Sequence, residues 1–83
     1  MVLHLYLLER TEDAPPADYE EFEGAVVAAY SAAAARKMHP RASPDKIRCG
    51  WVPPEQVKLT RLGLADPRHV REPQVILAAN RGA

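Results

Sequence analysis

Alternation of apolar side chains near the start of the chain predicts a β-strand over residues 2–8. In an extended segment, one side carries Leu3, Leu5 and Leu7, and the other carries Val2, His4, Tyr6 and Leu8. Because both sides are mainly apolar, we expect this strand to lie in the middle of a sheet. Residues 9–18 contain several charges and two adjacent prolines, which predict a loop.

A second strand and a short helix are expected next. Residues 24–30 are apolar and rich in alanine, so another element can approach this strand closely. Ser31 suits a helix N-cap, since its hydroxyl can accept a hydrogen bond from a free helical N–H. The alanine-rich residues 32–38 favour a helix, which the following His-Pro pair ends. So short a helix is unstable alone, and we expect it to pack on the sheet through Ala32, Ala35 and Met38.

Two further strands are expected at residues 56–64 and 74–79, separated by proline-containing loops. The first of them changes phase, because Val57 and Leu59 share one side while Leu62 and Leu64 share the other. That change predicts a bulge near Thr60-Arg61. The order of elements predicts an α+β fold in a single domain, residues 1–83. Its core is a small, mainly antiparallel sheet of about four strands with one short α-helix packed on one face. Because the edges of such a sheet are exposed, the protein could be either a monomer or a homodimer.

Composition narrows the class of protein. The chain has 83 residues, of which 47% are apolar, but 14 of the apolar residues are alanine. The core is therefore thin, and so small a chain rarely forms a deep cleft. The single cysteine, Cys49, cannot form an internal disulfide. The opening residues lack the features of a secretion signal, and we expect a cytoplasmic protein with no membrane contact.

No residue pattern for catalysis or cofactor binding is found. His4, His39, Cys49 and His69 do not show the spacing of metal ligands. There is no glycine-rich phosphate loop and no Gly-x-Ser-x-Gly motif. Cys49 is interpreted as a structural or surface thiol rather than a nucleophile. The sequence therefore predicts a protein that is not an enzyme, with no catalytic residues, no metal and no cofactor.

Charge is separated along the chain, although the net charge is zero. Residues 1–23 sum to −6 and residues 24–83 to +6. Carboxylates interleave with aromatic rings just before the second predicted strand, and we expect a partner-binding surface formed by Asp18, Tyr19, Glu20, Glu21 and Glu23. Aromatic rings supply binding energy at interfaces, and spaced carboxylates can imitate a phosphate array. The alternative is that the rings enter the core and the acids are solvated.

Basic residues gather in the following segment and form a rival surface. This basic patch consists of Arg36, Lys37, Arg41, Arg48 and Trp51. Lysine and arginine beside an aromatic ring can hold single-stranded nucleic acid through phosphate contacts and stacking. The alternative is that Trp51 covers the core and the basic residues are solvated or paired with the acidic loop.

The order of these segments resembles a family of small, largely uncharacterised proteins encoded by bacteriophages and prophages. The resemblance spans nearly the whole chain and rests on residues 4–8, 19–23, 25–29, 35–40 and 57–63, with Trp51 and residues 74–78. The chain differs from that family in having glutamate where aspartate is usual around Tyr19 and Phe22, and in lacking an aromatic residue in its last four positions.

The resemblance implies a protein that binds host machinery in the bacterial cell, a role for which anti-CRISPR proteins are the prominent class. Our first hypothesis is a non-enzymatic inhibitor that occludes a nucleic-acid-binding or subunit surface of a host defence complex, with a CRISPR effector as the candidate partner. The second is a small regulatory protein that binds nucleic acid through the basic patch. The third is a minor structural or assembly protein of a phage particle.

Overall fold

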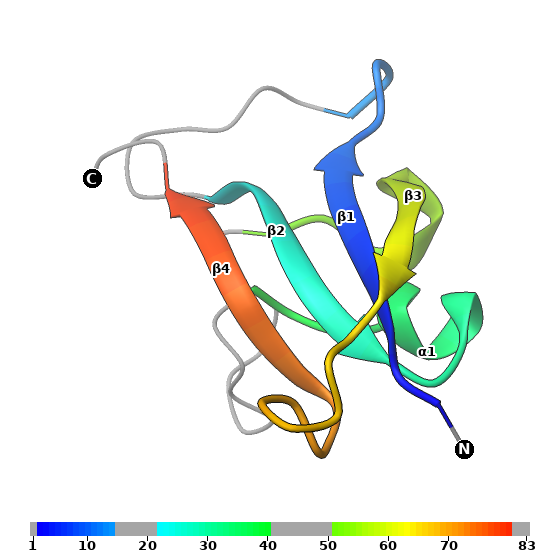
Figure 1. Ribbon diagram of the computed structural model, residues 1–83. Coiled ribbons are helices and arrows are strands. Elements are labelled where there is room, and N and C mark those ends of the chain that lie inside the picture. Colours follow the sequence, from blue (N-terminus) through cyan, green and yellow to red (C-terminus); the bar gives the residue numbers. More distant parts are fainter. Residues whose placement is uncertain (1, 15–21, 41–50, 81–83) are drawn as a thin grey trace.

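The computed structural model describes residues 2–14, 22–40 and 51–80, and its main element is a four-stranded antiparallel sheet (Figure 1). The strands are β1 (His4–Arg10), β2 (Phe22–Ala29), β3 (Val57–Leu64) and β4 (Gln74–Asn80). Their order across the sheet is β3-β1-β2-β4. The central position predicted for the first strand is therefore confirmed, while β3 and β4 are the two edges.

The hydrophobic core lies on one face of this sheet. Leu8 of β1 and Val27 of β2 are fully buried there, and Trp51 and Val52 pack against the same cluster. Tyr6 and Leu8 face the core, so the strand turns its Leu5 and Leu7 side to the opposite face. Burial of apolar area at about 25 cal/mol per Å² makes this one-sided cluster the main source of stability.

Helix α1 (Ala32–Arg36) adds one residue to the core. The predicted N-cap is confirmed, because the Ala34 N–H donates to Ser31 Oγ at 3.1 Å. Ala35 is fully buried, but Ala32 is exposed, and its predicted packing on the sheet was wrong. The helix is also shorter than predicted, and Met38 packs on the core from outside it. The described fold is thus mainly β.

A single 3-10 turn, η1 (Pro54–Gln56), precedes β3. No helix in the described ranges has the length and apolarity needed to cross a membrane.

Bulges shift the register of both edge strands. In β3, Gly63 pairs with Leu5 and Arg61 with Tyr6, which leaves Leu62 as the extra residue. The sequence predicted this bulge near Thr60-Arg61, next to its observed position. In β4, Ile76 is the extra residue between the pairs that Val75 and Leu77 make with β2. A bulge lets apolar side chains on either side of it face the core despite a break in alternation.

Strand β2 comes unusually close to β1 at Gly24. A Cβ atom at this position would lie 2.7 Å from the backbone oxygen of Leu8. We expect Gly24→Ala to force the two central strands apart and to lower the free energy of unfolding by about 1–3 kcal/mol. Urea unfolding followed by circular dichroism measures this change.

The matched control is Glu23→Ala, since the Glu23 side chain is exposed. We expect that substitution to change the stability by less than about 0.5 kcal/mol. An unfolding midpoint for Gly24→Ala equal to that of the unmodified protein would contradict the close approach of the two strands.

Candidate functional site

The face of the sheet opposite the core carries a row of side chains that crosses all four strands. The registers pair Thr60 with Leu7, Leu7 with Val26 and Val26 with Leu77. Directly paired residues of antiparallel strands project from the same face. The core cluster and the residues packed on it belong to the other face. We call this surface, with its neighbouring row Lys58, Glu9, Gly24 and Ala79, the open face.

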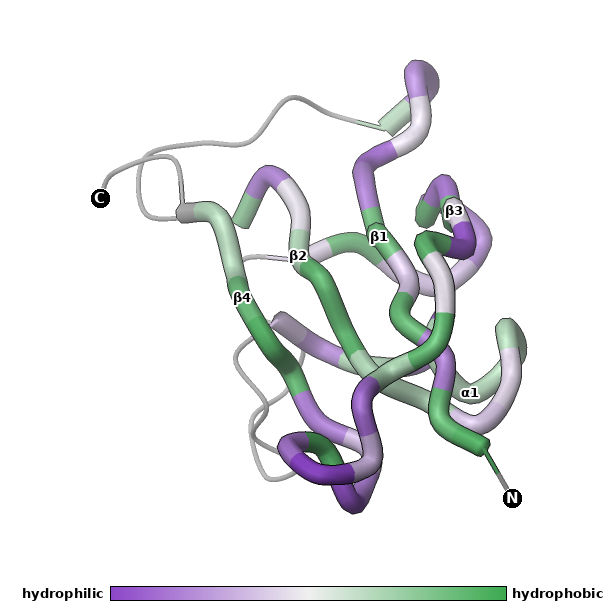
Figure 2. The backbone as a smooth tube through the Cα atoms, viewed as in Figure 1, coloured by the Kyte–Doolittle hydropathy of each residue, from purple (hydrophilic) through white to green (hydrophobic). Residues whose placement is uncertain are grey.

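The open face is apolar in its middle. Leu7 and Val26 are half-buried, and Leu77 at the β4 edge is 67% exposed. Figure 2 shows hydrophobic colouring in the middle of β4 and also along its neighbour β2. A contiguous apolar patch on a protein of this size is typical of an interaction surface.

A shallow hollow of about 280 Å³ lies in the open face. Its lining combines apolar side chains with two carboxylates and comprises Leu7, Glu9, Glu23, Gly24, Ala25, Val26, Leu77 and Ala79. This volume is at or below the smallest pockets that hold drug-sized molecules. A hollow of this size has room for a single side chain or a small molecule.

Carboxylates border the open face where β1 ends and β2 begins. Glu9 lies in the row that includes Gly24, and Glu23 precedes that glycine with an exposed side chain. Glu12 and Asp13 are exposed in the turn that follows β1. Lys58 is paired with Glu9 across the strands and offsets part of this charge. The border still favours a partner with lysine or arginine side chains.

Only part of the predicted acidic surface falls in the described chain. Asp18, Tyr19, Glu20 and Glu21 lie outside the described residues, whereas Glu23 is exposed and lines the hollow. The neighbouring ring of Phe22 is buried in the core and stands edge-on to the His39 ring with centroids 6.1 Å apart. For Phe22, the alternative in which a ring enters the core is therefore the observed one.

The basic patch is also described in part. Arg41 and Arg48 lie outside the described residues. The Arg36 guanidinium donates a hydrogen bond to the backbone carbonyl of Val57, and Lys37 is exposed. Trp51 is only 6% exposed, with the Arg10 guanidinium 5.6 Å from the centre of its ring. A ring in this position has no free face on which a nucleic-acid base can stack.

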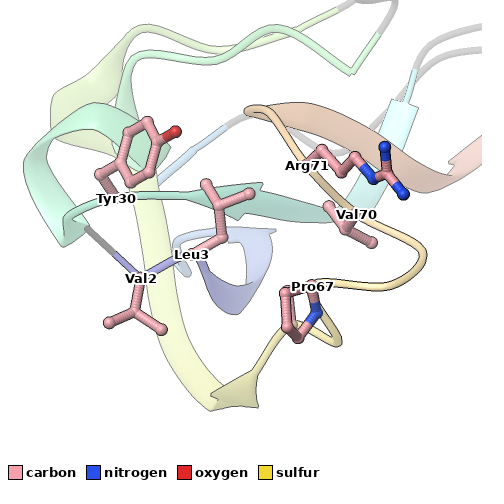
Figure 3. A pocket seen from close by; sticks show the side chains of 7 residues that line it. Val2, Leu3, Tyr30, Pro67, Val70 and Arg71 are labelled. Atoms are coloured by element: carbon pink, nitrogen blue, oxygen red, sulfur yellow. The ribbon is translucent and has the colours of Figure 1, made fainter.

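A second hollow, of about 220 Å³, lies beside the N-terminal end of β1 (Figure 3). Leu3 lies between Tyr30 on one side and Val70 and Arg71 on the other (Figure 3). Of the described residues that line it, Arg71 alone is charged. Sequence reasoning gave no sign of this hollow, since its residues are far apart in the chain.

Paired charges elsewhere have local roles. Asp66 accepts hydrogen bonds from Arg68 Nη2 at 3.0 Å and from the Arg68 backbone N–H at 2.9 Å. These bonds, the side-chain ones first, hold the pKa of Asp66 below its ordinary value. The pair is exposed and stabilises the turn it belongs to. Across residues 2–14, 22–40 and 51–80, no three histidine, cysteine or acidic residues gather as a metal site would require.

No protein-family model matches this chain, and comparisons with the curated proteins and with the solved structures find no match either. The resemblance to phage-encoded proteins therefore stays a prediction from the residues quoted above. The open face, defined by strand register and exposure, is the candidate site.

The buried position of Trp51 can be tested through its fluorescence, since it is the only tryptophan in the chain. We expect emission at shorter wavelength than that of free tryptophan, because the indole is shielded from water. Single-stranded oligonucleotide added at low salt should leave the emission unquenched, since no ring face is free for stacking.

Protein unfolded in urea supplies the control, in which the emission should move to longer wavelength. Saturable quenching by the oligonucleotide would contradict the placement of Trp51 and favour the nucleic-acid hypothesis.

Proposed function

We propose that this protein is a non-enzymatic binding protein that contacts a larger macromolecule through its open face. The observation that carries the proposal is the row Leu7, Val26 and Leu77, which ends at a side chain 67% exposed. A thin core favours burial of every large apolar side chain. An apolar row left at the surface is therefore typical of residues that are buried in a complex.

The chemistry of the surface specifies the kind of partner. Glu9 and Glu23 line the same hollow as Leu7 and Leu77, so an aliphatic or aromatic side chain of the partner would enter between carboxylates. A segment that carries such a side chain together with lysine or arginine complements both the apolar hollow and the negative charge around it.

Basic surfaces of this kind occur where proteins bind nucleic acid, because lysine and arginine neutralise the phosphates. A protein that presents carboxylates around an apolar hollow can cover such a surface and exclude the nucleic acid. This argument, together with the resemblance to phage-encoded proteins, supports an inhibitor of a host defence complex, with a CRISPR effector ribonucleoprotein as the candidate target.

The experiment is a direct binding measurement between the purified protein and a panel of purified CRISPR effector complexes. We expect one of them to bind the unmodified protein. The double variant Glu9→Lys, Glu23→Lys should bind it at least about tenfold more weakly, because both border charges then repel a basic partner.

The control for charge reversal is Glu72→Lys, since Glu72 is an exposed acid in the loop before β4, away from the acidic border. This variant should keep the affinity of the unmodified protein. Equal affinity of the double variant would show that the open face is the wrong surface, and binding to none of the complexes would remove the host-defence assignment.

A further inference from the structure

The two edges of the sheet differ in how they are protected against pairing. Edge strand β3 carries Lys58 and Arg61, a bulge at Leu62 and a glycine at position 63. Both edges carry a bulge, at Leu62 in β3 and at Ile76 in β4, so the feature that protects β3 in particular is its charge, which opposes strand-to-strand association. Edge strand β4, residues Gln74–Asn80, contains no charge and no proline.

Both edges expose large apolar side chains, Leu62 (52%) and Leu64 (60%) on β3 and Ile76 and Leu77 on β4, so the two edges differ in charge rather than in apolar exposure. Leu77 is 67% exposed and Ile76 is 44% exposed. The bulge at Ile76 is what leaves two adjacent large side chains at the surface, because it separates the pairs of Val75 and Leu77 with β2. An uncharged apolar edge of this kind is a template for another strand.

The sequence of β4 is complementary to itself when two copies run antiparallel. Val75 and Ala78 pack towards the core, whereas Leu77 lies on the open face. Paired residues must share a face, so a two-fold axis at Leu77 places Leu77 beside Leu77 and Val75 beside Ala78, with Ile76 remaining in its bulge. A larger side chain then meets a smaller one across the new interface.

The charge of the chain also favours pairing between two copies. The chain has zero formal net charge, so two copies do not repel each other as wholes. In a symmetric pairing each central residue lies near its own equivalent. Pairing through β3 would bring Lys58 and Arg61 of the two copies close together, whereas β4 carries no charge.

We propose that β4 is the edge through which two copies of this chain pair, antiparallel about a two-fold axis at Leu77, into one continuous sheet. The dimer joins the apolar rows of the two open faces at Leu77. It does not depend on the identity of the partner proposed above. An edge pairing buries less surface than a standard protein interface, so we expect dissociation in the micromolar range.

Analytical ultracentrifugation between about 1 µM and about 500 µM tests the proposal, with a monomer–dimer equilibrium as the expected result. The variants Leu77→Lys and Leu77→Glu should each raise the dissociation constant more than about tenfold, because each places like charges at the axis. An equimolar mixture of the two should restore dimers, since lysine then faces glutamate. Circular dichroism checks that both variants are folded.

Matched controls come from Thr60 on β3, which is exposed and lies in the same row at the opposite edge. Thr60→Lys and Thr60→Glu should dimerise like the unmodified protein. A protein that stays monomeric up to the highest concentration overturns the proposal. Dimers that persist in both Leu77 variants would also overturn it. An equimolar mixture of the two variants that stays monomeric would do the same.

A second measurement does not depend on introducing charge. In a Cys49→Ser background, Leu77→Cys should form an intermolecular disulfide under mild oxidation, since residues beside a two-fold axis in paired strands can meet disulfide geometry. Thr60→Cys should react much more slowly. Equal rates would overturn the assignment of the edge. The Glu9→Lys, Glu23→Lys variant should remain dimeric, so loss of partner binding and loss of pairing are separable.

Discussion

The close pairing of β1 with β2 is the interaction on which the rest of the structure depends. These strands supply Leu8 and Val27, which are fully buried, and they meet so tightly at Gly24 that no Cβ fits between that residue and Leu8. Each edge strand pairs with one of them, and the core cluster packs on one side of both. Because the core cluster packs on that side, Leu7, Val26 and Leu77 on the other side remain partly or largely exposed, although Ala28 there is buried.

Much of this fold could be predicted from the alternation of apolar residues. The strand positions and the cap at Ser31 follow from local patterns that survive in the structure. The helix was predicted too long, because alanine propensity describes an isolated segment and takes no account of what it packs against. Only Ala35 meets the core within α1. Which side of β1 faces the core was not predictable, since both sides are apolar and residues distant in sequence, such as Trp51 and Val52, decide it.

The candidate site was predictable only in fragments. Glu23 belongs to the acidic segment that the sequence singled out, and the structure places it beside Glu9 and the apolar row. No spacing within the chain indicates that Leu7, Val26 and Leu77 are neighbours, because their contact depends on the strand order and on the bulge at Ile76. For Trp51, in contrast, the sequence suggested a site that the fold does not form. Its basic neighbours in sequence suggested a binding ring, whereas its surroundings in space place it in the core.

The strand order has a consequence for the route by which the chain folds. Both central strands come from the first half of the sequence and both edges from the second half. During synthesis, β1 and β2 therefore emerge before β3 and β4. Until those strands are made, neither outer edge of the β1–β2 pair has a strand to pair with. Closure of such distant pairings makes folding slow relative to a helical protein of equal length. We therefore expect the incomplete pair of β1 and β2, with both outer edges unpaired, to be prone to aggregation during synthesis.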